Sequence, residues 1–334
     1  MESKGSSVRR TIALEEHFSA PAELSKDQHE GSLPHGGSSA AYYSEFVRKL
    51  ADLGEIRISD MDAAGIDVQV LSLTSPGTEQ MEPADAVNFA RSVNDFVAKA
   101  IERHPSRLAA FAALPTSAPD KAADELERTV QGYGFRGAVI NGHSRGRYLD
   151  DKFFWPILER AEDLSVPIYI HPTVPPRPVV DAYYAGQFSQ DIIFALSTSG
   201  WGWHIETAVH VIRLILSGAF DRYPKLQIII GHLGEAIPFM MDRMDRRFSM
   251  ELTKLDRPIS SYLCENFSYT ISGFNFTPAF LNLLLKVGVE RIMFSTDYPY
   301  SSMNEAREFL ERLPVSHADR EKIAHTNAER LMRF

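Results

Sequence analysis

The sequence predicts an α/β protein that folds as a single (β/α)₈ barrel, the TIM barrel, with long loops at its mouth. Short apolar segments and amphipathic helical patterns alternate along the chain. The apolar segments are rich in Ile, Val and Leu, which is typical of parallel strands covered by helices on both faces. Eight such strand–helix units fit a chain of 334 residues, and eight are what this barrel requires.

Each of the eight units begins with a segment that we predict to be a strand. The strands are expected at 11–18, 68–77, 107–114, 137–142, 166–172, 226–234, 266–272 and 291–299. Helical patterns lie between them, for example at 46–65, 84–104, 118–134 and 154–164. In these stretches the apolar residues recur at the spacing of an amphipathic helix.

Two long segments interrupt this alternation. Residues 19–40 are rich in Ser, Gly, Pro and His, and residues 173–200 are rich in Pro and Tyr. Both follow the carboxyl end of a strand, where barrel enzymes carry their active sites, and loops of this length are usually functional or disordered. We therefore expect 11–334 to form one barrel domain with long mouth loops, preceded by a flexible tail at 1–10.

The bulk composition excludes several classes of protein. A formal net charge of −9 argues against nucleic acid or an anionic membrane surface as the main partner. The single cysteine, Cys264, forms no internal disulfide, which fits a reducing compartment. The first residues lack the apolar region of a secretory signal, and no apolar run approaches the roughly 18–20 residues that cross a bilayer. These observations predict a cytoplasmic enzyme.

The first strand ends in three ionisable side chains, Glu15-Glu16-His17. Because side chains alternate along a strand, Glu15 and His17 share one face, and Ile12 and Leu14 lie on the other. If the aliphatic pair packs outward against helices, Glu15 and His17 point into the barrel. A buried carboxylate beside an imidazole is costly unless a cation lies nearby, so this strand suggests a bound cation.

Two further strands end in polar residues that the same alternation turns inward. His171 ends the strand at 166–172, and Asp297 lies near the end of the strand at 291–299. His232 follows a strand whose two faces are equally apolar, so alternation places it near the mouth without deciding where it points.

Glu15, His17, His171 and Asp297 therefore converge, because the first and last strands of a closed barrel are neighbours. Carboxylate and imidazole ligands together suit a divalent ion such as Zn²⁺ or Mn²⁺, and an incomplete protein shell leaves room for substrate. Taken singly, each residue also fits a structural role. A strand-end histidine can be a hydrogen-bonded structural residue, Glu15 can pair with an arginine, and Asp297 can begin a turn. Their shared placement favours the metal site.

Other residues near the mouth are candidates for substrate contact. His143 follows the fourth strand, where it can touch substrate, although a loop histidine more commonly binds backbone. Trp203, Phe274 and Tyr298 lie in segments that follow strands. Aromatic residues often fill cores, yet several at one mouth suit a flat aromatic substrate.

Four motifs occur in a fixed order along the chain: ALEEHF, YIHP, GHLGEAIPFMMDRMDRR and FSTDYPY. With them the chain resembles, almost end to end, the amidohydrolase-2 branch of the amidohydrolase superfamily. Within that branch it is most similar to the metal-dependent nonoxidative decarboxylases that act on γ-resorcylate, 2,3-dihydroxybenzoate and 5-carboxyvanillate. The Glu-x-His opening is typical of this decarboxylase branch, whereas hydrolytic members more often begin with His-x-His.

The resemblance implies one divalent metal ion, Zn²⁺, Mn²⁺ or Mg²⁺, and no organic cofactor. The implied metal ligands are Glu15, His171 and Asp297, with His17 as a further ligand in those members that have a histidine at this position. The resemblance also implies that His232 lies beside the substrate, with Glu235 as its hydrogen-bonding partner. It implies that Arg243 meets the substrate from a neighbouring subunit or helix, and that the protein is a homodimer or homotetramer.

The site and the resemblance together predict a nonoxidative decarboxylase of an ortho-hydroxybenzoate-type acid, a dihydroxybenzoate or a substituted salicylate. Asp297 is expected to protonate the ipso ring carbon before CO₂ leaves, while His232, supported by Glu235, bonds a substrate oxygen. The main alternative is a metal-dependent hydrolase of a lactone or amide on the same barrel. A non-catalytic metal-binding protein is a second alternative, which the long mouth loops disfavour.

Overall fold

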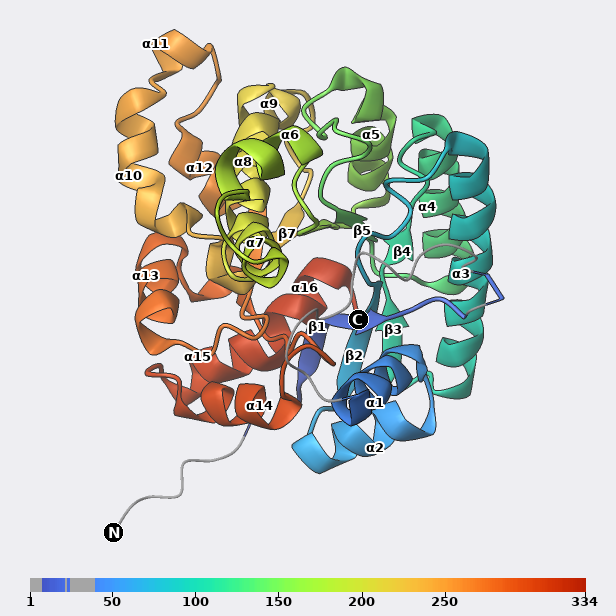
Figure 1. The fold of residues 1–334 in the computed structure, drawn as a ribbon. Helices are drawn as coiled ribbons and strands as arrows, with labels where there is room; N and C mark the ends of the chain where they lie inside the picture. Colours follow the sequence, from blue (N-terminus) through green and yellow to red (C-terminus); the bar gives the residue numbers. More distant parts are fainter. Residues whose placement is uncertain (1–7, 22, 25–39) are drawn as a thin grey trace.

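The computed structural model describes residues 8–21, 23–24 and 40–334, in which strands and helices alternate (Figure 1). The strands are β1 (Ile12–Phe18), β2 (Val68–Leu73), β3 (Leu108–Ala110), β4 (Ala112–Ala113), β5 (Ala138–Asn141), β6 (Ile168–His171), β7 (Ile228–Ile230), β8 (Phe267–Thr270) and β9 (Ile292–Met293). The helices are α1 (Ala40–Ala51), α2 (Glu55–Ala64), α3 (Pro83–Arg103), α4 (Pro119–Tyr133), α5 (Trp155–Leu164), α6 (Arg177–Val179), α7 (Gln190–Ser197), α8 (Gly202–Leu216), α9 (Ala219–Arg222), α10 (Ile237–Arg247), α11 (Met250–Thr253), α12 (Ile259–Glu265), α13 (Thr277–Val287), α14 (Met303–Arg312), α15 (His317–Glu321) and α16 (Asn327–Met332). Short 3₁₀ or π turns are η1 (Lys152–Phe154), η2 (Val180–Tyr184), η3 (His232–Gly234), η4 (Val289–Arg291) and η5 (Lys322–Thr326).

The strands form one closed parallel barrel. β1 to β3 make one ladder and β4 to β9 a second, each strand pairing with the next along the chain. The ladders meet where the N–H of Phe111, between β3 and β4, donates to the carbonyl of Leu71 in β2 at 2.9 Å. Leu14 of β1 bridges in parallel to Ser295, just beyond β9. Each of the eight predicted segments contributes to the barrel, with β3 and β4 sharing one position, and the predicted fold is confirmed.

Apolar side chains fill both sides of the barrel wall. An inner cluster collects residues from most of the strands, among them Val70, Tyr169 and Met293, and it includes Ala328 of α16. Because α16 packs against this cluster, it closes the amino-terminal end of the barrel. An outer, larger cluster packs the opposite faces of the strands against the helices. The carboxyl ends of the strands remain available for a site, as in other barrels of this kind.

β1 departs from regular alternation at Glu15. Ile12 and Leu14 belong to the inner cluster, so the prediction that they pack outward is wrong. The register of β1 against β2 shifts between Ala13 and Glu16, and Glu15 has a left-handed backbone with φ of 63°. Such a bulge turns two consecutive side chains to one face. Leu14 and Glu15 therefore both point into the barrel, and the inward direction predicted for Glu15 arises from the bulge.

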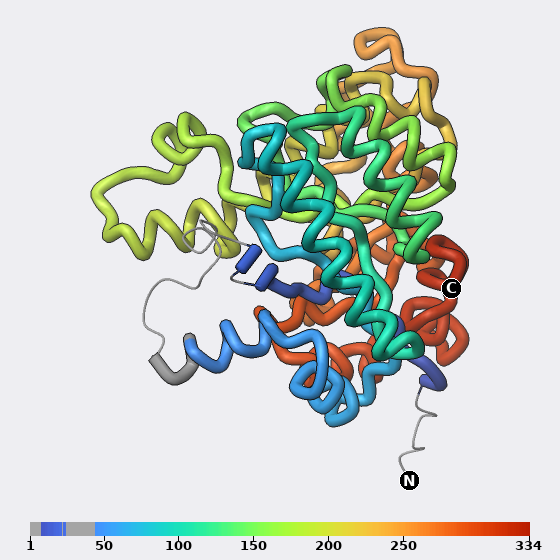
Figure 2. Tube along the Cα trace, turned by 90° about the vertical axis from the view of Figure 1, so that its right-hand side faces the viewer, coloured from blue at the N-terminus to red at the C-terminus, as the bar shows by residue number. Residues whose placement is uncertain are grey.

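The predicted long loop after β6 is partly helical. It contains α6, η2 and α7, and in Figure 2 it stands out from the body of the molecule on the side away from the C-terminus. Phe194, Thr198 and Ser199 from this segment line the cavity at the strand ends. The segment is therefore one wall of the mouth.

Parts of two other predictions lie outside the described residues. They are residues 1–7 of the predicted tail, and residues 22 and 25–39 of the predicted first mouth loop. Val8, the first of the described residues, is buried, and the N–H of Arg9 donates to Glu321 at 3.1 Å. None of the described helices combines the length and the hydrophobicity that a membrane crossing needs.

Candidate active site

A cavity of about 380 Å³ opens at the carboxyl ends of the barrel strands. Its lining residues are Thr74, Ser75, His171, Phe194, Thr198, Ser199, Trp203, His204, His232, Ser272, Gly273, Phe274, Asp297, Tyr300 and Ser301. Aromatic rings and small hydroxyl groups therefore make up most of the wall. Among the described residues, neither lysine nor arginine lines it.

Glu15 lies fully buried beside this cavity, held through one of its two carboxylate oxygens. Oε2 accepts hydrogen bonds from the hydroxyl groups of Tyr169 and Ser272. Oε1 has no hydrogen-bond partner among the described residues. It lies 3.4 Å from Nε2 of His171 and 3.7 Å from Nε2 of His232. One oxygen thus anchors the side chain, and the other faces a group of imidazoles.

His17 and Asp297 complete this group of donors. Nε2 of His17 lies 3.2 Å from Oδ1 of Asp297, and the rings of His17 and His171 meet edge to face with centroids 4.7 Å apart. Donor atoms of Glu15, His17 and His171 all lie within 4.8 Å of one another. The same holds for Glu15, His232 and Asp297. The structure therefore brings together all four side chains that the sequence predicts as metal ligands.

The donor set fits a divalent cation. Burial raises the pKa of Glu15, an effect that His232 and His17 reduce and Asp297 increases. Burial also lowers the pKa of His171, as do the neighbouring histidines. Divalent metals take ionised carboxylates and neutral imidazoles as ligands. The open oxygen of Glu15 and the ring nitrogens of His17, which lack hydrogen-bond partners within the described part of the chain, are suitable donors.

His232 faces the cavity from η3 and is oriented by Glu235. Nδ1 of His232 donates to Oε1 of Glu235 at 2.7 Å. Burial opposes protonation of His232, but the charges of Glu235 and Glu15 outweigh it and raise the pKa of His232 to about 10. Burial alone would raise the pKa of Glu235, yet His232 and His204 lower it. Glu235 is therefore an ionised hydrogen-bonding partner of His232.

Four of these site residues have left-handed backbones. The φ angles are 63° at Glu15, 50° at His232, 55° at Glu235 and 65° at Asp297. A non-glycine residue in this region costs on the order of 1–3 kcal/mol, and such residues cluster at functional sites where surrounding contacts hold them. The hydrogen bonds of Glu15 and Glu235 are contacts of this kind.

Glu16 points to the opposite side of the barrel wall. Its carboxylate accepts the N–H of Thr296 at 2.8 Å and the amide of Gln69 at 2.8 Å. The buried guanidinium of Arg57 donates to Gln69 at 3.0 Å and to the carbonyl of His17 at 2.6 Å. This network ties the end of β1 to the segment after β9, and so fixes the backbone that carries the donors.

Three residues predicted to contact substrate lie outside the cavity lining. Arg243 is exposed on α10. The hydroxyl of Tyr298 donates to Asp60 at 2.8 Å, on the helix side of the wall. The ring nitrogens of His143 bind backbone groups, which is the alternative that the sequence left open for it. Of the predicted substrate contacts, Trp203 and Phe274 do line the cavity.

Tyr300 and His204 also line the cavity, although the sequence assigns a catalytic or metal-binding role to neither. Tyr300 places its ring 5.3 Å from that of His17, and His204 lies 2.6 Å from Glu235. Tyr300 follows the turn after Asp297, where strand alternation no longer applies. His204 begins a helix far from any strand end, so only its tertiary contact with Glu235 reveals it.

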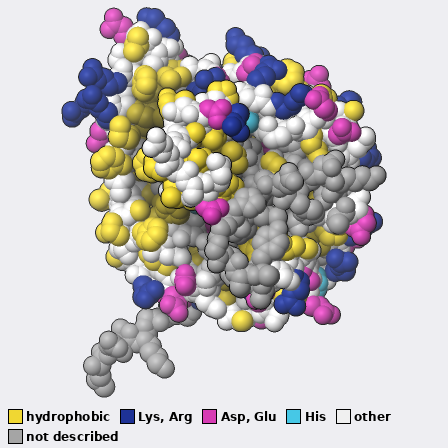
Figure 3. Space-filling model, in the orientation of Figure 1, with side chains coloured by type: hydrophobic (Ala, Val, Ile, Leu, Met, Phe, Trp, Pro, Cys, Tyr) yellow, Lys and Arg dark blue, Asp and Glu magenta, His cyan; other side chains and the backbone are white. Residues whose placement is uncertain are grey.

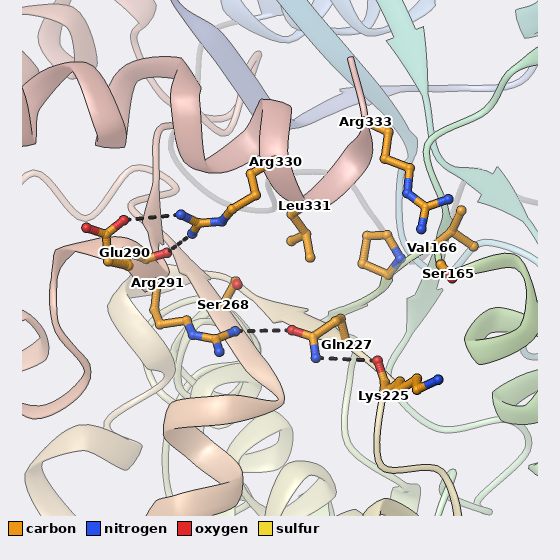
Figure 4. Close-up of a pocket in the computed structure, with 11 residues that line it drawn as sticks. Ser165, Val166, Lys225, Gln227, Ser268, Glu290, Arg291, Arg330, Leu331 and Arg333 are labelled. Carbon is orange, nitrogen blue, oxygen red and sulfur yellow. Dashed lines mark hydrogen bonds and ion pairs between the residues drawn. The ribbon is translucent and has the colours of Figure 1, made fainter.

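A second cavity of about 380 Å³ lies at the opposite end of the barrel (Figure 4). Its lining includes Gln227, which precedes β7, and residues of α16. Arg330 is bonded to Glu290 at 3.1 Å and Arg291 to Gln227 at 3.1 Å. None of the strand-end donors reaches it, and residues at this end of a barrel usually serve stability. The first cavity is therefore the candidate active site.

Gly231 provides the space in which the Glu15 carboxylate lies. A Cβ here would lie 2.7 Å from Oε2 and 3.1 Å from Oε1 of Glu15, while the φ of −81° suits alanine. We expect Gly231→Ala to fold but to bind Mn²⁺ about 10- to 100-fold more weakly, as measured by equilibrium dialysis. Gly132→Ala, at a position with no neighbour within 4 Å in the described structure, is the control. Equal affinities for the two variants would contradict the assigned role of Glu15.

Residues 46–334 match the family described as Amidohydrolase. The chain is 37% identical to γ-resorcylate decarboxylase from Rhizobium sp., over 97% of this chain and 98% of that protein. A solved 2,6-dihydroxybenzoate decarboxylase, in complex with 2,6-dihydroxybenzoate, superposes with a TM-score of 0.88 at 35% identity, covering 97% of this chain and 99% of the other. The dihydroxybenzoic acid decarboxylase of Polaromonas sp., solved with manganese and the inhibitor 2-nitroresorcinol, has a TM-score of 0.88 and 36% identity over 97% of each chain. The chain therefore belongs to the amidohydrolase family, as its motifs predicted.

Proposed function

We propose that this chain is a metal-dependent nonoxidative decarboxylase of an aromatic acid with a hydroxyl group ortho to its carboxylate, such as a dihydroxybenzoate or a substituted salicylate. The observation that carries this proposal is the opening of the four-donor site into a cavity with aromatic walls. Relatives named as decarboxylases of γ-resorcylate and 2,6-dihydroxybenzoate support this substrate class and favour decarboxylation over the hydrolase alternative. Residues 11–334 would act as one catalytic domain.

Glu15, His17, His171 and Asp297 are the proposed metal ligands. The chemistry supplied by a divalent ion bound there is Lewis-acid stabilisation of the carboxylate and ortho-phenolate oxygens of the substrate. The Polaromonas relative was solved with manganese, and Zn²⁺, Mn²⁺ and Mg²⁺ are the candidate ions. The proposal includes no organic cofactor.

Asp297 is the proposed proton donor. Loss of CO₂ from an aromatic ring leaves an electron pair on the ring carbon unless that carbon is protonated first. Asp297 lies at the cavity edge, with 16% of its side chain exposed, where it can deliver a proton to the ipso carbon. The ring loses aromaticity on protonation, and regains it when the carbon–carbon electron pair returns to the ring as CO₂ departs.

His232 and the aromatic wall orient the substrate for this proton transfer. Nε2 of His232 is turned toward Glu15 and the cavity, since Nδ1 is held by Glu235. From there it can donate a hydrogen bond to a substrate oxygen. Trp203 and Phe274 contribute apolar surface against which a flat ring packs and from which water is displaced. The chain thus offers a donor for the oxygen and a surface for the ring.

We also propose that the protein is a homodimer or homotetramer. Phe239 on α10 and Leu285 on α13 are 76% and 82% exposed, and hydrophobic side chains gather over this part of the molecule in Figure 3. Arg243 is exposed one helical turn beyond Phe239 on α10. A second copy packed here would bury the apolar groups and bring Arg243 toward a neighbouring subunit. Sedimentation equilibrium tests this, and a species of 37.5 kDa alone would contradict it.

The proposed setting is the cytoplasm, which the single cysteine favours. A small aromatic carboxylic acid is the proposed partner. Nucleic acid and membrane surfaces are not expected as partners, because the net charge of −9 repels both.

A substrate panel tests the proposed function. Metal-loaded protein is expected to release CO₂ from 2,6-dihydroxybenzoate or a substituted salicylate. It should leave 4-hydroxybenzoate unchanged, because that acid lacks the ortho hydroxyl group. Removal of the metal with a chelator should abolish the release, and added Mn²⁺ or Zn²⁺ should restore it. Mass spectrometry of the products measures the outcome. Hydrolysis of lactones or amides without any CO₂ release would overturn the proposal.

Replacing Asp297 by asparagine tests the proton donor. Asparagine keeps the shape of the side chain and an oxygen for the metal, but it has no carboxyl proton to deliver. We expect kcat to fall by about 10²- to 10⁴-fold, while metal analysis still finds a bound ion. Asp124→Asn, on the surface of α4 with its side chain 60% exposed, is the matched control. Full turnover by Asp297→Asn would rule this role out.

A further inference from the structure

His204 occupies the cavity wall without a role in the proposed reaction. It lies near the start of α8, and its side chain is 12% exposed. Its ring meets those of His232 and Phe274 edge to face, with centroids 4.9 Å and 5.0 Å away. It is therefore packed directly against the imidazole that faces the substrate.

Both ring nitrogens of His204 face oxygen acceptors. Nδ1 lies 2.6 Å from Oε2 of Glu235, and Nε2 lies 3.0 Å from the carbonyl oxygen of Ser199. A carbonyl oxygen and an ionised carboxylate can only accept hydrogen bonds. Nδ1 can therefore donate to Glu235, while Nε2 is directed at the Ser199 carbonyl. Both ring nitrogens of His204 thus contact oxygen atoms of the protein.

The two carboxylate oxygens of Glu235 bind two different histidines. Oε1 accepts from His232 and Oε2 from His204, and the residue is 1% exposed. With each oxygen held by one ring, the carboxylate has a single orientation. Among the described lining residues no lysine or arginine could replace His204 in this role.

We propose that His204 is a positioning residue that acts through Glu235 to hold the His232 ring in its orientation toward the substrate. This inference rests on the proposed decarboxylase function. Residues that fix the orientation of a functional histidine through hydrogen bonds typically affect activity strongly, although they do not touch the substrate. Loss of His204 therefore lowers kcat and leaves KM nearly unchanged, whereas a residue that only fills the wall would alter KM.

Two variants separate these roles. His204→Leu fills the space without a donor, and His204→Asn places an amide N–H near the former Nδ1. We expect kcat of His204→Leu to fall about 10- to 100-fold with KM little changed, and His204→Asn to recover most of the loss. His104→Asn, at the end of α3 and outside the cavity lining, should behave as the parent chain. Equal loss in the Leu and Asn variants, or no loss in either, would overturn the proposal.

Crystal structures of the same variants give a second readout that does not depend on turnover. In His204→Leu the Glu235 carboxylate and the His232 ring should leave their present positions, and in His204→Asn they should keep them. An undisturbed His232 ring in His204→Leu would overturn the proposal. If the parent chain released CO₂ from no ortho-hydroxybenzoate, that result would contradict the proposed function instead. The crystal structures of the variants would still test the positioning role of His204.

Discussion

The buried carboxylate of Glu15 is the constraint on which the rest of the site depends. Taking an ion of this kind out of water costs several kcal/mol even after relaxation, and hydrogen bonds to a charged group return about 1.5–3 kcal/mol each. Tyr169 and Ser272 provide such bonds to Oε2, while Oε1 remains open toward His171. A divalent ion bound at the proposed site would offset the remaining cost, because it would attract the carboxylate and take neutral imidazoles as its other ligands.

The barrel supplies the rigidity that such a site needs. Neighbouring parallel strands hold the donors at fixed distances, and the network of Glu16, Gln69 and Arg57 behind the wall locks the end of β1. The left-handed backbones at Glu15 and Asp297 direct both carboxylates in ways that regular strands would not. Packing and hydrogen bonding elsewhere offset the strain. The positions of the proposed ligands are therefore set by the folded barrel wall, and the proposed substrate class follows from the lining of the cavity.

Sequence reasoning located the strands and the donors because both depend on local patterns. Runs of Ile and Val mark parallel strands, and polar residues at their ends mark the mouth. It failed where geometry departs from the pattern. The bulge at Glu15 lets Ile12 and Leu14 point into the barrel together with Glu15, whereas regular alternation would place them on the opposite face. The residue types give no signal that Glu15 adopts a left-handed backbone. His204 was missed because its importance lies in a contact with Glu235, 31 positions away, that only the assembled fold creates.

Anomalous diffraction from crystals grown with Mn²⁺ tests the central claim most directly. A single strong manganese peak should lie within coordination distance of Oε1 of Glu15, a nitrogen of His17, Nε2 of His171 and a carboxylate oxygen of Asp297. A peak bound elsewhere, or a lack of any peak among these four side chains at saturating Mn²⁺, would contradict the account.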